Sequence, residues 1–412
     1  MRILAISNYY PPLELGGWPQ LTENNVFSLK KRGHEVMVLT SRYQIEQLET
    51  SEQGVLRSLH LESPDHEHYH VSYTWEHRFW EIQNQDNLSR IASNFMPDII
   101  FINGMWNLPV SLAKKAEQLF PGRVIYYMAS LWPVEIDAHS AYWSSESAKT
   151  YLRFPKKIIS QIIKNTIITG TPRNCLDFPL VLCVSDYVRQ IMIREAAIPK
   201  ERTRVVHNGV EIDHLIKREP LRITNPLRLI FAGRLSPEKG VHTAIESLSH
   251  LHQKSPDLQF YLSIYGEGPG EYETKLKNLI RESNLEDKIK CFGWVSREEM
   301  LKILPNHDVL LFPSICHDAL ARILQEAMAC GLVVIGTMTG GTPEILEEGK
   351  NGLTFEVGNA EQLAEKISYI AKDTKIYARL ASAAIKTVEE KFTLEGMVDN
   401  LERYFFETAG RN

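Results

Sequence analysis

Cysteine is scarce in this chain, with five residues among 412. No two of them stand at the spacing of a zinc site or of a disulfide framework. Scattered single cysteines are typical of proteins from a reducing compartment. The pattern therefore excludes a small disulfide-stapled scaffold and favours a cytoplasmic location. The five are Cys175, Cys183, Cys291, Cys316 and Cys330.

Long apolar runs and an excess of positive charge are missing as well. No run approaches the ~18 apolar residues that a membrane-spanning helix needs. The opening residues MRILAIS predict a strand and not a signal peptide. The net charge is -5 at pH 7, without the basic excess of a nucleic-acid binder. These absences predict a soluble globular protein, long enough for two domains of ordinary size.

The most informative stretch that is present runs from Leu227 to Gln253. It opens with an uninterrupted apolar run, Leu227–Ala232, which is typical of a buried parallel strand. After Gly233, Ser236 suits the N-cap of a helix and Pro237 its first helical position. The apolar positions of that helix recur at helical spacing, at Val241, Ala244, Ile245, Leu248 and Leu251.

The charges at this helix start are unusual. Arg234 and Lys239 lie where the helix macrodipole disfavours a cation by roughly 0.3–1 kcal/mol. A bound anion would reverse that sign, because two cations and free backbone N–H groups would converge on it. The pattern therefore predicts a phosphate site, and two solvated basic residues in a surface loop are the alternative.

Two motifs resemble those of the retaining family 4 glycosyltransferases, and they follow each other along the chain in the order expected for that family. The segment Gly233-Arg234-Leu235 with Lys239-Gly240 resembles the loop that binds the donor phosphates in that family. Phe312-Pro313-Ser314, followed by Asp318 and by Glu326 to Gly331, resembles its second signature. The resemblance is strongest from Val181 to Leu363 and weakest from Gln44 to Pro97.

Strands and helices alternate along the whole chain, which predicts α/β domains with parallel sheets covered on both faces. The first unit is strand Arg2–Ser7, helix Trp18–Arg32 and strand Glu35–Thr40. The resemblance implies two Rossmann-like doubly wound domains facing across a cleft, the GT-B arrangement. We expect an acceptor-side domain over residues 1–210, a linker at 211–226 and a donor-binding domain at 227–393. The last helix, within 394–412, is expected to pack back on the first domain.

The resemblance also implies roles for individual residues. Arg234 and Lys239 would neutralise the departing diphosphate, and Asp318 would meet the donor sugar. Glu326 would accept hydrogen bonds from the ribose hydroxyls, and the backbone of Leu320, Ala321, Arg322 and Ile323 would bind phosphate. The glycine-rich first turn is expected to approach the same diphosphate, which adds Gly16 and Gly17 to the donor-binding residues. Gly233, in the phosphate loop itself, is a further donor-binding residue.

The chain departs from the family pattern at two places. The family usually has Glu-Gly-Phe-Gly where this chain has Asp318-Ala319-Leu320-Ala321, and alanine reaches positive φ less cheaply than glycine. We therefore expect a reshaped sugar pocket. Ala129-Ser130 replaces a His-Asp pair of many relatives, so an acceptor-side histidine is missing. Asp137 and His139 are candidates to substitute for it, and Trp132 offers either a flat face for a sugar or a core side chain.

Metal ligands are not evident in the sequence. The chain lacks an Asp-x-Asp pair, with which metal-dependent sugar transferases hold a divalent ion. His66, His68 and His70 would share one face of a strand, but no carboxylate or cysteine completes a site. We therefore predict a solvated variable loop over Gln44–Trp80 and an enzyme that needs no metal or cofactor.

The predicted function is transfer of a sugar from a nucleotide-diphosphate sugar, such as a UDP- or GDP-sugar, to a hydroxyl acceptor with retention. The alternative, suggested by the two departures, is a nucleotide-sugar-binding partner subunit that has lost turnover. The segment Lys149–Arg173 is basic, lacks acidic residues and has isoleucines on one helical face. Such a helix can contact an anionic membrane from the cytoplasmic side. An ordinary helix packed on the sheet is the alternative.

Overall fold

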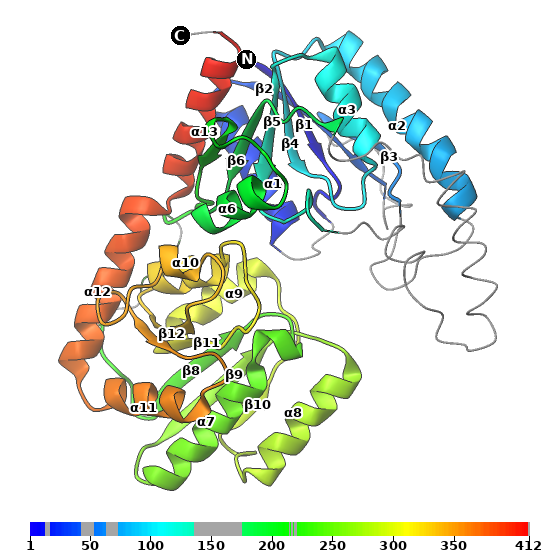
Figure 1. Ribbon diagram of the computed structural model, residues 1–412. Coiled ribbons are helices and arrows are strands. Elements are labelled where there is room, and N and C mark those ends of the chain that lie inside the picture. The colour runs from blue at the N-terminus through cyan, green and yellow to red at the C-terminus, as the bar shows by residue number, and fades with distance from the viewer. Residues whose placement is uncertain are drawn as a thin grey trace, which may run out of the picture. The chain divides into compact units, whose positions relative to one another are not determined.

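The chain folds into two compact units in a computed structural model, which describes residues 1–12, 17–42, 53–62, 73–135, 175–213, 215, 217 and 221–410 (Figure 1). Unit 1 comprises Met1–Val206 and Val398–Asn412, and unit 2 comprises His207–Met397. Unit 1 is therefore assembled from two stretches that are distant in sequence. The described residues contain no helix long and apolar enough to cross a membrane.

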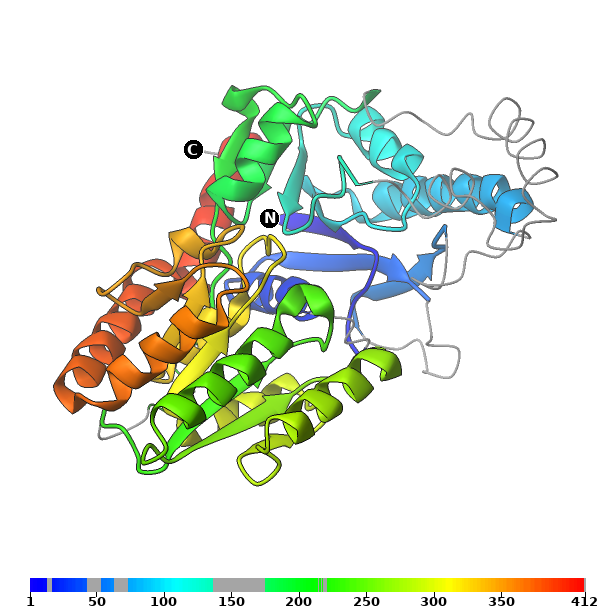
Figure 2. The same ribbon diagram turned by 60° about the horizontal axis from the view of Figure 1, so that its bottom comes forward.

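Unit 1 is built on a seven-stranded parallel sheet in the order β3-β2-β1-β4-β5-β6-β7. The central strands are buried along almost their whole length, because helices cover both faces of the sheet (Figure 1 and Figure 2). The strands are β1 Arg2–Ser7, β2 Glu35–Ser41, β3 Val55–Leu59, β4 Ile99–Gly104, β5 Val124–Met128, β6 Leu180–Cys183 and β7 Thr203–Val205. The helices are α1 Trp18–Lys31, α2 Tyr73–Phe95, α3 Val110–Leu119, α6 Asp186–Arg194 and the 3-10 turn η3 Lys200–Arg202.

Two elements of unit 1 correct the expectation of a long variable loop over Gln44–Trp80. Val55–Leu59 forms β3, paired in parallel with β2, and α2 begins at Tyr73. β3 was not predicted from the sequence because it is a short edge strand with an exposed Leu56 and polar residues between its buried ends. The triplet His66, His68 and His70 lies outside the described residues.

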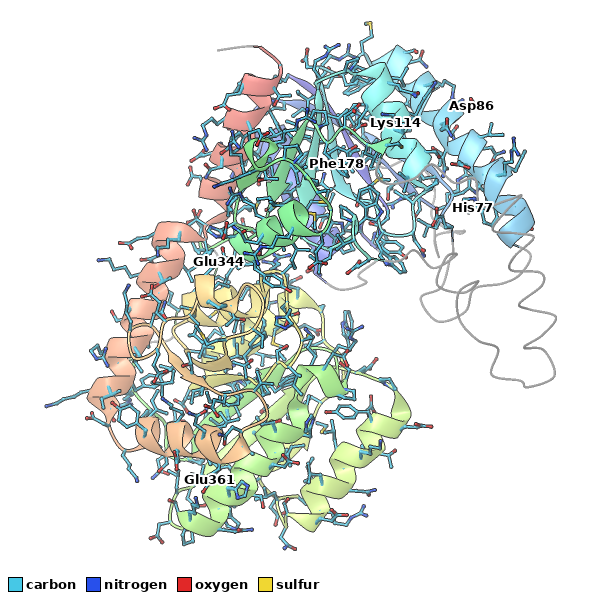
Figure 3. All side chains as sticks on the ribbon, in the orientation of Figure 1. His77, Asp86, Lys114, Phe178, Glu344 and Glu361 are labelled. Atoms are coloured by element: carbon cyan, nitrogen blue, oxygen red, sulfur yellow. The ribbon has the colours of Figure 1, made fainter. Side chains whose placement is uncertain are left out.

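A buried carboxylate anchors the segment just before β6. Glu117 of α3 accepts hydrogen bonds from the backbone N–H groups of Asp177 and Phe178 and from the Tyr126 hydroxyl. Lys114, one turn earlier on the same helix, lies 3.7 Å from the Glu117 carboxylate; Figure 3 shows Lys114 and Phe178 in unit 1. Burial beside Glu117 holds the pKa of Tyr126 well above its ordinary value.

Unit 2 is built on a six-stranded parallel sheet in the order β10-β9-β8-β11-β12-β13. Its strands are β8 Leu227–Ala232, β9 Phe260–Tyr265, β10 Ile289–Cys291, β11 Val309–Phe312, β12 Val333–Thr337 and β13 Leu353–Phe355. The helices are α7 Val241–Lys254, α8 Gly270–Glu282, α9 Arg297–Ile303, α10 Arg322–Ala329, α11 Ala360–Ala371 and α12 Thr374–Lys391. Three 3-10 turns complete it, η4 Pro237–Lys239, η5 Leu304–Asn306 and η6 Thr342–Glu344.

The predicted α/β class with two doubly wound parallel sheets is confirmed. In each sheet the strand order reverses once, between β1 and β4 in unit 1 and between β8 and β11 in unit 2. At such a switch point the connections from two neighbouring strands leave in opposite directions, which opens a crevice at their carboxyl ends. Ligands of this fold class are therefore expected beyond β8 and β11.

The end of the expected linker is part of unit 2. Asp308, fully buried before β11, accepts hydrogen bonds from the backbone N–H groups of Thr224 and Arg228, at 3.0 and 2.7 Å. Buried carboxylates need such donors, so these bonds fix residues 224–228 beside β11.

The two chain segments at the border of the units lie side by side within unit 2. Val210 donates to the Phe392 carbonyl at 2.8 Å and accepts from the Leu394 N–H at 2.9 Å. A side chain at Gly209 would meet the Thr393 carbonyl oxygen at 2.2 Å, so only glycine permits this approach.

Helix α13, Leu394–Thr408, then enters unit 1 at Val398. Its Phe405 packs edge-on against Phe101 of β4, with 4.9 Å between ring centroids. Its Glu402 is bound by Arg32 and His34, from the connection between α1 and β2. From Val398 on, the helix thus belongs to the core of unit 1.

Candidate functional site

The crevice of unit 2 is bounded by the connections that leave β8 and β11. The β8 connection carries Gly233 to Gly240, and the β11 connection carries Pro313 to Ala321. The two are tied together, because the backbone N–H groups of Ile315 and Cys316 both donate to the Glu238 carbonyl, at 2.8 and 3.1 Å. The predicted phosphate loop and the second motif therefore meet at the switch point.

The helix after Gly233 begins later than its sequence indicates. Pro237–Lys239 forms the 3-10 turn η4, Gly240 takes φ 69°, and the α-helix starts at Val241. Gly240 interrupts the helix because its α-carbon lies against Pro313, where a β-carbon would come within 1.9 Å of the carbonyl oxygen. This left-handed residue directs Lys239 towards the β11 connection.

Lys239 and Asp318 form an ion pair in this crevice. The lysine Nζ lies 2.5 Å from Asp318 Oδ1, and the two side chains are 19% and 23% exposed. Asp318 Oδ2 accepts a hydrogen bond from the Ser314 hydroxyl at 3.0 Å. Both charges are mostly enclosed, and the exposed fraction that remains leaves them within reach of a ligand.

The loop after β12 contacts the backbone of Asp318. Gly341 N–H donates to the Asp318 carbonyl at 2.8 Å. β-carbons at Gly340 and Gly341 would lie 2.2 and 2.1 Å from the carbonyl oxygens of Asp318 and Ala319. The two glycines therefore allow direct backbone contact with the loop that carries the acid.

Arg234 is not brought together with Lys239 and Asp318. Its side chain is 68% exposed and lies 3.4 Å from Glu238, one turn further on. The nearby Ser236 hydroxyl is the main reason why the pKa of Glu238 is lowered, and the charges of Arg234 and Lys239 add to it. Arg234 is a long, exposed cation at the rim of the site, in contrast to the mostly enclosed Lys239.

Glu326 is enclosed by two arginines. Its side chain is 6% exposed, and its Oε1 accepts from Arg297 Nε at 2.7 Å and lies 3.8 Å from Arg322. Glu326 was predicted from its motif, whereas Arg297 was not predicted. The available signal was a cation in the first turn of a helix, at α9, where acidic residues are favoured.

The four residues expected to offer backbone N–H groups to phosphate stand at the start of α10. Ala321 is its N-cap, with φ -72°, and Arg322 its first residue. None of the described non-glycine residues from 318 to 323 has a positive φ. Alanine at 319 and 321 is therefore free of backbone strain, which corrects the reason given for a reshaped pocket.

The candidate residues of unit 1 have different outcomes. Gly17 is the exposed N-cap of α1. Trp132 is 3% exposed and packs edge-on against Phe178, which favours the core alternative over a sugar platform. Gly16, Asp137, His139 and the segment 149–173 lie outside the described residues.

A polar group occupies the switch point of unit 1. Asn8 follows β1 and donates to the Trp106 carbonyl at 2.9 Å, across the carboxyl ends of β1 and β4. Gly104, at the end of β4, lies so close to the Trp18 indole nitrogen that a β-carbon would be 2.2 Å from it. Farther along this edge, His77 of α2 lies 3.1 Å from the Glu62 carboxylate (Figure 3). Among the described residues, no group of three His, Cys, Asp or Glu side chains could hold a metal ion.

The crevice of unit 2 can bind a compact anion beside a hydroxylated group. Lys239, Arg234 and the N-terminus of α10 favour negative charge. Asp318 and Glu326 are acceptors suited to hydroxyl groups. This combination fits a phosphorylated sugar-containing molecule.

Two family models match consecutive parts of the chain. The model described as Glycosyltransferase Family 4 matches residues 16–214, and the model described as Glycosyl transferases group 1 matches residues 213–387. Among relatives, N-acetyl-alpha-D-glucosaminyl L-malate synthase of Bacillus anthracis is 30% identical over 220 residues, which cover 52% of this chain and 56% of that protein. The chain spans 45–65% of the length of the first curated relatives it matches.

Solved structures share the fold over the whole chain. A glycosyltransferase from Rickettsia africae ESF-5 matches with a TM-score of 0.73 at 19% identity, covering 100% of this chain and 99% of that one. Alr3699/HepE from Anabaena, in complex with UDP and glucose, matches with a TM-score of 0.68 at 20% identity, covering 98% and 99%. At these identities the likeness concerns the fold alone.

Proposed function

The chain belongs to the group 1 and family 4 glycosyltransferases and has the GT-B fold, and from this premise we propose that it transfers a sugar from a nucleotide-diphosphate sugar to a hydroxyl acceptor. We infer further that the anomeric configuration is retained and that the donor is a UDP-sugar. Anabaena Alr3699/HepE, which shares the fold, is described in complex with UDP-glucose.

The observation that carries the proposal is the Lys239–Asp318 pair at the switch point of unit 2. It combines a cation for a diphosphate with an acceptor for a sugar hydroxyl, between the connections where ligands of doubly wound sheets bind. The pair is enclosed enough to strengthen its electrostatic effect and exposed enough to receive a ligand.

In the proposed reaction, the bond between the anomeric carbon and the diphosphate oxygen breaks, and the diphosphate leaves with the electron pair. When the donor binds, before this bond breaks, Lys239 turns from Asp318 Oδ1 to the phosphate oxygens, where negative charge grows as the bond lengthens. A fixed cation at this place stabilises the transition state more than the ground state. Arg234, at the rim, forks onto further phosphate oxygens.

Asp318 and Glu326 orient the two ends of the donor. When Lys239 turns to phosphate, Asp318 Oδ1 is released to accept a hydroxyl of the donor sugar. Glu326, enclosed on α10, accepts hydrogen bonds from the ribose. The acceptor hydroxyl attacks the anomeric carbon and gives its proton to the departing phosphate, so that the net charge balances.

Binding and turnover of nucleotide sugars test the proposal. Melting temperatures are measured with UDP, GDP and ADP and with their glucose, galactose and N-acetylglucosamine conjugates, because a ligand of the folded state raises the melting temperature. Slow release of free sugar and nucleoside diphosphate from the stabilising donor is then followed without acceptor. Stabilisation with turnover supports the enzyme, stabilisation without turnover supports the partner-subunit alternative, and no stabilisation contradicts both.

Metal dependence is a separate prediction. Lys239 supplies the positive charge that a divalent ion supplies in other transferases, so we expect EDTA to leave turnover unchanged. The measurement is the rate of donor turnover with EDTA and with added Mg²⁺. Complete inhibition that Mg²⁺ reverses would contradict this assignment of Lys239.

A further inference from the structure

Glu326 is held by a residue from a different helix. Arg297 is the first residue of α9, before β11, and Glu326 lies on α10, after β11. The Arg297 Nε–H donates to Glu326 Oε1 at 2.7 Å. The two side chains are 21% and 6% exposed, so the bond is formed in a largely enclosed place.

The position of Arg297 is itself fixed. Ser296 caps α9 by accepting from the Glu299 N–H at 3.2 Å, and Glu299 accepts in return from the Ser296 N–H at 3.1 Å. This capping box defines where α9 starts and therefore where the Arg297 side chain leaves the backbone. A short charge-assisted bond from so fixed a donor holds the carboxylate in one orientation.

The two arginines contact the same oxygen of the Glu326 carboxylate. Among the described residues, the arginine contacts of the carboxylate, from Arg297 and Arg322, both reach Oε1. Oε2 is thereby left as the oxygen that a ligand hydroxyl can use. An unheld glutamate would lose rotamer freedom on binding, and Arg297 removes that cost before the ligand arrives.

We propose that Arg297 is a positioning residue for the nucleotide, which holds Glu326 Oε1 so that Oε2 faces the ribose hydroxyls. The inference rests on the proposed function, because it takes Glu326 to bind the nucleotide. Arg297 acts through Glu326 and does not touch the ligand.

The test is calorimetric titration of UDP, and of GDP and ADP, into the full chain and its variants. Arg297→Ala is expected to weaken binding of the preferred diphosphate about tenfold, as loss of one charge-assisted bond does. Glu326→Ala is expected to weaken it at least as much. The double variant Arg297→Ala, Glu326→Ala should bind no more weakly than Glu326→Ala alone, since Arg297 has nothing left to position.

Lys302→Ala is the matched control. Lys302 lies on the same helix, is 64% exposed and pairs with the exposed Glu298, so its loss removes the same charge without touching Glu326. It should bind UDP like the unaltered chain. Arg297→Gln, which keeps a long polar side chain, is measured in the same way with the same expectation if the alanine variant unfolds.

Turnover distinguishes positioning from a merely structural role. Arg297→Ala should raise the donor KM about tenfold and change kcat less than about twofold, because the reacting end of the donor is untouched. Unimpaired or tighter binding by Arg297→Ala overturns the inference, and so does a double variant weaker than Glu326→Ala. Failure of the unaltered chain to bind any of the three diphosphates overturns the proposed function and this inference together.

Discussion

In the proposed reaction, Lys239 is the residue on which the chemistry of unit 2 depends most directly. It is mostly enclosed, it pairs with the Asp318 carboxylate, and Gly240 directs it towards the β11 connection. We expect Lys239→Ala to lower kcat by about 10²–10³ with little change in melting temperature, the loss caused by removing one preorganised charge stabiliser. Steady-state turnover of the donor measures the effect.

The control for this change is Lys254→Ala. Lys254 stands at the far end of α7, is 55% exposed and pairs with Glu361, so its removal should leave turnover unchanged. A Lys239→Ala variant that turns over like the unaltered chain would refute the phosphate assignment.

Asp318 is expected to discriminate between the sugar and the nucleotide. Its removal leaves a sugar hydroxyl without an acceptor, which costs about 1–3 kcal/mol only when the sugar is present. Asp318→Ala should therefore weaken binding of the intact nucleotide sugar and scarcely change binding of the free diphosphate, as measured by calorimetry. Losses of equal size for both ligands would show that Asp318 serves only to hold Lys239.

Individual site residues were only partly predictable. Lys239, Asp318 and Glu326 stand in motifs, so their types and order pointed to them. That Lys239 Nζ touches Asp318 was not predictable, because it depends on a left-handed glycine and on backbone contact with Pro313. Arg297 stands in no motif, and its proposed role rests on the contact that its side chain makes from α9 with Glu326 of α10.

At the scale of elements, the η4 turn and Gly240 determine where α7 begins. Gly240→Ala forces a β-carbon to 1.9 Å from the Pro313 carbonyl oxygen, at φ 69°. Gly349 has nearly the same φ, 68°, but none of the described residues outside its own neighbours would lie within 4 Å of a β-carbon added there. Comparing alanine substitutions at these two glycines separates the cost of backbone strain from the cost of steric contact.

We expect Gly349→Ala to destabilise unit 2 by about 1–2 kcal/mol, the cost of the left-handed conformation alone. Gly240→Ala should cost about 1–3 kcal/mol more and should also lower kcat, because its loop carries Lys239. Denaturant unfolding and turnover measure the two effects. Equal destabilisation by both variants would show that the loop moves away from Pro313 freely.

Most elements were predictable because their apolar residues recur without interruption at the spacing of a strand or a helix. The run Leu227–Ala232 is β8 residue for residue, and Leu394–Thr408 is α13. The exceptions have physical reasons. β3 is a polar edge strand, and the start of α7 is displaced by a tertiary contact that leaves no trace in helical periodicity.

At the scale of the whole molecule, Glu402 ties α13 to the rest of unit 1. Burial raises its pKa, but hydrogen bonds from His34 and Arg32 outweigh that effect and lower the pKa below its ordinary value of 4.5. A lowered pKa in the folded state means that the carboxylate stabilises the fold above about pH 4.5 and loses this effect as the pH falls through the lowered pKa.

Glu402→Gln should therefore lower the melting temperature at about pH 7 by a few degrees, and the difference from the unaltered chain should shrink at about pH 4. Differential scanning calorimetry at both pH values measures it. Glu407→Gln, at an exposed position of the same helix, should have no such effect. A difference that is independent of pH would mean that packing of α13, and not this ion pair, carries the contribution.

The return of the chain to unit 1 has a consequence for biosynthesis. A ribosome delivers β1 to β7 first, then all of His207–Met397, and only afterwards Val398 and Phe405. Throughout that interval the nascent first sheet lacks the ring that covers Phe101, and the bare apolar surface is open to aggregation. All residues of unit 2 have been translated while unit 1 still lacks the part of α13 from Val398 on. The unit that is translated first is therefore the one completed last. Chaperones that bind apolar surface have their target on this sheet until α13 has been translated.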